Sequence, residues 1–140
     1  MQLPVICSNN ANMLINISLL DAKVCDCAPA DPGSFAVPDE IEGVSFLTEG
    51  ETLIWTSLAS SSGSATSYEV YRELENGGPA GSSPGGSCAS PPPTGTVFVD
   101  SEVPPIGTAW RYLVRGRNAC GAGTWGSASN GTPRPVGNCP

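Results

Sequence analysis

The alternation of side chains in Ala109–Arg117 is the feature that most constrains how this 140-residue chain can fold. Trp110, Tyr112 and Val114 fall on one side of an extended chain, while the positions between them are mostly arginine. A period of two is typical of a strand with one buried face. A second apolar run, Thr96–Val99, precedes it across a Pro-Pro and Gly turn. The region therefore predicts paired β-strands.

Further strand-like runs fill the central region, and turns rich in Gly, Ser and Pro separate them. The runs are Ile41–Leu47, Thr52–Leu58, Ser67–Leu74 and a short stretch near Thr124–Ser129. Together with a short entry strand at Phe35–Pro38, they predict an all-β fold, a seven-stranded antiparallel sandwich. The side chains expected to face inward are Trp55, Tyr68, Val70, Val97, Val99, Trp110, Tyr112 and Val114. The long Gly/Pro/Ser-rich segment Glu75–Gly95 is predicted to be a loop.

The outer face of the same strands is predicted to carry opposite charges on neighbouring strands. Glu69 and Glu73 would face Arg111 and Arg115 as a cross-strand charge ladder, with a ligand-binding role as the alternative. Tyr71 would lie exposed on this face, and an exposed aromatic side chain often marks a contact.

Several of these segments resemble a fibronectin type III domain, in particular the bacterial secreted kind. Trp55 stands where the family has its core tryptophan, and Tyr68–Arg72 resembles its "Y-x-V-Y-R" strand. Tyr112 stands where the family has a strand tyrosine, which anchors a corner in many β-sandwiches. Asn118–Gly126 resembles the turn before the last strand in the bacterial members of the family. The resemblance spans about Ile41 to Arg134. It implies an immunoglobulin-like, non-catalytic extracellular β-sandwich.

Three regions are expected. Residues 1–33 form an N-terminal extension with an apolar strand and a Cys/Asp/Pro connector, residues 34–135 the sandwich, and residues 136–140 a Cys-Pro tail. In the run Met13–Leu20, one strand face would be wholly apolar, which suits a contact with another subunit. The expected contact residues are Met13, Ile15, Ile17 and Leu19.

Six cysteines are spread along the chain, and none shows the C-x₂-C spacing of a zinc site. They are Cys7, Cys25, Cys27, Cys88, Cys120 and Cys139. The even number predicts disulfides in an oxidising, extracellular compartment. Cys88 is predicted to pair with Cys120 and to anchor the long loop. Cys139 would pair with Cys25 or Cys27, and Cys7 would bond the one that remains, within the chain or in a neighbour.

Charge and residue types argue against most other functions. The net charge is −7, and eight of the thirteen acidic residues precede Thr52, which disfavours nucleic acid as a partner. The absence of histidine excludes Ser-His-Asp and Cys-His catalysis, so we predict no enzyme and no cofactor. The acidic loops lack calcium-site spacing, so no metal is predicted. No apolar run approaches the roughly 20 residues of a membrane span.

Two functions remain open. The first is a structural subunit of a cell-surface filament, in which Met13–Leu20 adds to a sheet edge of the next copy and forms a head-to-tail polymer. The second is an isolated adhesion or carbohydrate-binding module of a larger secreted protein or enzyme, with surface glycans as partners. In that case the N-terminal strand would fold back onto its own domain.

Overall fold

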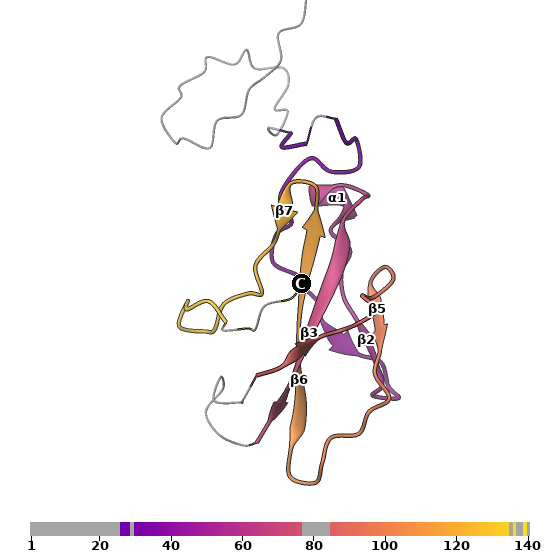
Figure 1. Cartoon of the computed structure of the whole chain (residues 1–140), viewed down its shortest axis with the longest axis vertical. Coiled ribbons are helices and arrows are strands. Elements are labelled where there is room, and N and C mark those ends of the chain that lie inside the picture. The colour runs from indigo at the N-terminus through magenta and orange to yellow at the C-terminus, as the bar shows by residue number, and fades with distance from the viewer. Residues whose placement is uncertain (1–25, 29, 77–84, 135, 137–138, 140) are drawn as a thin grey trace, which may run out of the picture.

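The computed structural model describes residues 26–28, 30–76, 85–134, 136 and 139. This part of the chain is mostly β, with two antiparallel sheets (Figure 1). One sheet has the order β1 (Ser45–Phe46), β2 (Thr52–Ile54), β5 (Val97–Val99). The other has the order β4 (Ser87–Cys88), β3 (Ser67–Glu75), β6 (Ala109–Asn118), β7 (Gly121–Ala122). A single helical turn, α1 (Ala59–Ser62), lies between β2 and β3.

The two long strands β3 and β6 form the centre of the fold. They pair without a break from Ser67 opposite Arg117 to Glu75 opposite Ala109. Because side chains alternate along both strands, one face of this pair turns to the other sheet and the second face turns away. Residues that alternate along the sequence of β3 and β6 therefore point to opposite faces of the sheet.

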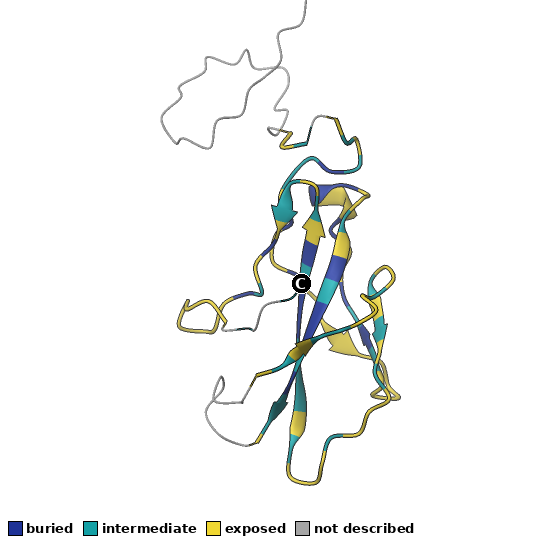
Figure 2. Ribbon diagram, in the orientation of Figure 1, coloured by how far each residue is buried: buried dark blue, intermediate teal, exposed yellow. Residues whose placement is uncertain are grey.

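The apolar core lies between the two sheets, which gives a β-sandwich-like arrangement. Figure 2 shows the buried residues concentrated along β3 and β6. The cluster consists of Ile41, Leu53, Trp55, Leu58, Tyr68, Val70 and Val114. The inward positions predicted for Trp55, Tyr68, Val70 and Val114 are confirmed. Tyr112 is half-buried and packs against the cluster.

The predicted register of β5 is wrong. Val97 and Val99 were expected inside, but 43% and 62% of their surfaces are exposed. Phe98 faces the core instead, and its ring lies 6.5 Å from that of Tyr112. In a run of three apolar residues no polar side chain marks the outer face, and the largest of them occupies the interior.

The predicted charge ladder is present on the outer face of β3 and β6. Arg115 is 2.6 Å from Glu69, and Arg111 pairs with Glu73. Tyr71, however, is only 2% exposed, so the prediction of an exposed aromatic is wrong. The Trp125 ring lies 6.1 Å from it and also packs over Arg115. Tyr71 is therefore part of a second, smaller packed layer.

Several predicted element boundaries change. The predicted loop Glu75–Gly95 contains β4, which pairs with β3 through Tyr71 and Cys88. The last strand, β7, precedes the predicted Thr124–Ser129, where the structure has an isolated bridge at Ser127. The turn at β6–β7 comes earlier because Asn118 accepts the Cys120 N–H, a short-range bond typical of turns.

The disulfides differ from those predicted. Cys27 bonds Cys120, and Cys88 bonds Cys139. Cys88 lies opposite Tyr71, four residues along β3 from the end near Cys120, which is about 13 Å at ~3.3 Å per residue. A Cys88–Cys120 bond would need Cα atoms within about 7 Å. The two predicted partners are thus at different heights in the sheet. Cys7 and Cys25 lie outside the described residues.

Candidate functional site

A groove with a volume of about 710 Å³ lies beside β5. β5 forms one wall, and the segment Ser90–Thr94, which links β4 to β5, forms the other. Three successive prolines stiffen that second wall because each proline ring fixes φ. The groove therefore has one strand wall and one rigid loop wall.

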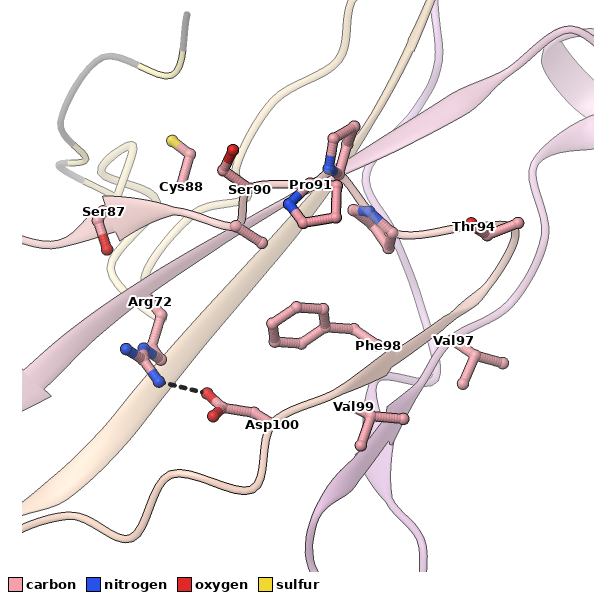
Figure 3. Close-up of a pocket in the computed structure, with 13 residues that line it drawn as sticks. Arg72, Ser87, Cys88, Ser90, Pro91, Thr94, Val97, Phe98, Val99 and Asp100 are labelled. Carbon is pink, nitrogen blue, oxygen red and sulfur yellow. Dashed lines mark hydrogen bonds and ion pairs between the residues drawn. The ribbon is translucent and has the colours of Figure 1, made fainter.

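Phe98 marks the apolar floor of the groove. Figure 3 shows its ring directed toward Pro91, whereas Val97 and Val99 point away. Pro91, Pro92 and Pro93 add further apolar surface, while Ser87, Ser90 and Thr94 contribute hydroxyl groups at the rim. An apolar side chain that entered the groove beside Phe98 would contact the Phe98 ring on one side and the proline rings on the other.

The backbone of β5 has an outward hydrogen-bonding edge. Trp55 N–H donates to the Thr96 carbonyl at 3.3 Å, and Asp100 N–H donates to Glu51 at 2.8 Å. Bonded positions alternate along an antiparallel strand, so Phe98 also directs its N–H and C=O at β2. The N–H and C=O of Val97 and Val99 consequently point away from β2, toward the sheet edge.

One end of the groove is closed by a charged cluster around Arg72 and Asp100. Their side chains are 2.6 Å apart, and Arg72 also reaches Glu102 at 2.7 Å. The guanidinium carbon lies 4.0 Å from the Trp110 ring centre, a cation–π distance. Tyr112 donates its hydroxyl to Asp100 at 2.8 Å. Arg72 is thus fully engaged by partners within the fold.

These contacts shift the pKa values of Asp100, Tyr112 and Arg72, and each shift favours the ionised Arg72–Asp100 pair and the neutral Tyr112 hydroxyl. Burial would raise the pKa of Asp100, but hydrogen bonds from the Glu102 N–H, Arg72 and Tyr112 hold it below its usual value. Burial and the bond to Asp100 raise the pKa of Tyr112 to about 12. Burial opposes the charge on Arg72, yet Asp100 and Glu102 raise its pKa. At neutral pH the cluster is therefore an ionised pair beside a neutral phenol.

The outer face of the three-stranded sheet is mostly apolar and is uncovered by the described residues. Leu47 lies opposite Thr52 on one row with Val99, and Ile54 lies between Ser45 and Val97 on the next. Leu47, Val97 and Val99 are each more than 40% exposed. Contiguous exposed apolar side chains commonly mark a protein–protein contact.

The predicted site residues divide into two groups. The structure brings Cys27, Cys88, Cys120 and Cys139 into two disulfides, and the second of these ties the C-terminal tail to β4. The predicted subunit contacts Met13, Ile15, Ile17 and Leu19 lie outside the described residues.

Phe98 and the prolines of the groove were not predicted as site residues from the sequence. The dense Ser90–Thr94 segment, with three prolines in a row, was the available signal. Such a run restricts the chain and keeps a loop extended. Within the described residues, no group of three or more His, Cys, Asp or Glu side chains could hold a metal ion.

Comparison with protein-family models, curated proteins and solved structures gives no match for this chain. The described helix is too short to cross a membrane.

Proposed function

We propose that this protein is a non-catalytic, extracellular structural protein of the fibronectin type III kind, which assembles into a head-to-tail polymer at the cell surface. The N-terminal strand Met13–Leu20 of one subunit adds to the sandwich of the next. The three- and four-stranded sheets around Trp55 and the two disulfides support the family and the compartment.

One observation carries the proposal. The outer face and edge of the three-stranded sheet leave Leu47, Val97 and Val99 exposed on neighbouring positions of one surface. The same chain holds an apolar run, Met13–Leu20, that the sequence predicts to be a strand and that lies outside the sandwich region. Exposed strand edges associate readily unless something covers them. A second copy supplies a suitable cover.

The groove supports a second candidate, a glycan-binding adhesion module. Its rim carries the hydroxyl groups of Ser87, Ser90 and Thr94 beside the Arg72–Asp100 pair, and such polar groups can hydrogen-bond sugars. This candidate requires a monomer that binds surface glycans without self-association.

The two candidates are separated by the size of the non-reduced protein. Size-exclusion chromatography and negative-stain microscopy of the full chain should reveal polymers, and a variant that lacks residues 1–20 should be a soluble monomer. The same monomer should keep the near-ultraviolet circular dichroism of the folded sandwich. Truncated protein that still polymerises, or full-length protein that stays monomeric at high concentration, would contradict the filament proposal. A monomer that binds glycans on an array would favour the adhesion module.

A further inference from the structure

We infer that the acceptor for the N-terminal strand is the edge of β5, with the groove beside it receiving one face of that strand. This inference rests on the proposed function and names the site of contact. The occupant is Met13–Leu20 of a second copy of the chain.

The edge of β5 offers backbone partners. The N–H and C=O of Val97 and Val99 point away from β2, because Thr96 and Asp100 use theirs toward it. In strand addition, such main-chain groups supply much of the affinity, and pockets for alternate side chains supply the specificity. β5 has both, since the groove lies directly along it.

The side-chain pattern of the donor fits the two sides of this edge. A strand beside β5 would direct alternate residues to the side of Phe98 and the prolines, which offer apolar surface. Met13, Ile15, Ile17 and Leu19 form such a face. The opposite face, which includes Leu14 and Leu20, would join Val97 and Val99 on the outer face of the three-stranded sheet. Both sides of the edge thus gain apolar contact.

Charge does not oppose this contact. Met13–Leu20 contains no ionisable side chain. The charged side chains that line the groove, Arg72 and Asp100, already form an ion pair. An uncharged strand therefore enters without leaving a buried charge unpaired.

The connector allows the contact to form between copies. Cys27 is fixed by its disulfide to Cys120, beyond the end of β6. The seven residues from Leu20 to Cys27 span at most about 25 Å when extended. Because this length also reaches β5 of the same chain, a second copy as the acceptor follows from the proposed function, and a contact between unlike surfaces of two copies propagates without closing.

A proline at Val99 tests the edge. It removes a donor that points outward but leaves the β2 ladder intact, because proline is tolerated where the N–H faces away from the paired strand. We expect Val99→Pro to raise the concentration needed for assembly about tenfold or more. Val99→Thr keeps the N–H and should assemble at close to the wild-type concentration. Val103→Pro, at a loop valine that is 83% exposed, is the control for the substitution itself.

Photo-crosslinking gives a second readout that does not depend on the stability of the proline variant. Benzoylphenylalanine at position 99, in a mixture of ¹⁵N-labelled and unlabelled full-length protein, should crosslink to peptides within residues 13–20 of the other isotope. Crosslinks only within one chain, or only to other surfaces, would overturn the inference. Circular dichroism checks that Val99→Pro is folded. If this folded variant polymerises like the wild type, and removal of residues 1–20 still abolishes polymers, then the β5 site is wrong but assembly through the N-terminal strand stands. If full-length protein never assembles, the proposed function itself fails.

Discussion

The side chain of Asn118 joins three parts of the fold at the end of β6. Its Nδ2 donates to the carbonyl of Ala36 at 2.8 Å and to that of Ser62 at 2.9 Å. Its Oδ1 accepts the N–H of Cys120 at 2.9 Å. The segment before β1, α1 and the β6–β7 turn are thus held by one amide. Replacing Asn118 with alanine removes all three bonds together.

The expected loss follows from the number of bonds. A hydrogen bond contributes about 1 kcal/mol net, and a buried partner left unsatisfied costs about 1–3 kcal/mol. Because Asn118 is half-buried, its partners can regain some water. We expect the free energy of unfolding to fall by about 3 kcal/mol. With an unfolding entropy of about 2.1 cal/mol/K per residue, this lowers the Tm by about 10 °C.

Urea unfolding, followed by tryptophan fluorescence, measures this loss. Asn118→Asp keeps the acceptor for Cys120 but loses both donors, so it should lose about two-thirds of that stability or more at neutral pH. Asn76→Ala, at an exposed asparagine directly after β3, is the matched control and should change stability by less than ~0.5 kcal/mol. A loss below about 0.5 kcal/mol for Asn118→Ala, with an unchanged m value, would refute the role assigned to this amide.

Three further changes test the core, the outer face and the groove. Leu53→Ala, at a residue that is 2% exposed, should lower the free energy of unfolding in urea by about 3 kcal/mol, whereas Leu47→Ala at an exposed position should cost less than ~1 kcal/mol. Arg111→Ala leaves the buried Glu73 carboxylate without its cation, with the Tyr71 hydroxyl still donating to it, and should cost about 3 kcal/mol in the same assay. Adding Glu73→Gln should recover part of this loss, and no recovery would contradict the pairing. Because the pKa of Tyr112 is raised to about 12, the stability that its neutral hydroxyl gives the fold is complete below pH 10 and is lost as the pH rises toward 12. Melting temperatures across that range should therefore fall less steeply for Tyr112→Phe than for the wild type. Parallel curves would contradict this assignment.

The sequence predicts the central sheet well because charged side chains mark one face of β3 and β6. Glu69 lies between the inward-facing Tyr68 and Val70, and Arg115 follows the inward-facing Val114, so the charges indicate which face turns to the core. Val97–Val99 has no such separation, and its register depends on the size of Phe98 and the space beside Tyr112. Local pattern alone does not contain that information.

Long-range packing explains the remaining differences. Tyr71 is buried because Trp125, 54 positions later in the chain, lies over it, and nothing near Tyr71 in the sequence signals this. The pairing of Cys88 with Cys139 likewise depends on the height of each cysteine in the sheet. The groove beside β5 arises from the path of Ser90–Thr94 in space, so the sequence predicts a loop there but not the hollow it encloses.

Sedimentation velocity of the non-reduced full-length protein tests the central proposal, self-assembly, most directly. Runs over a hundredfold range of concentration should show species that grow with concentration, and removal of residues 1–20 should collapse them to one slow monomer boundary. A single monomer boundary for the full-length protein at every concentration would contradict the proposal.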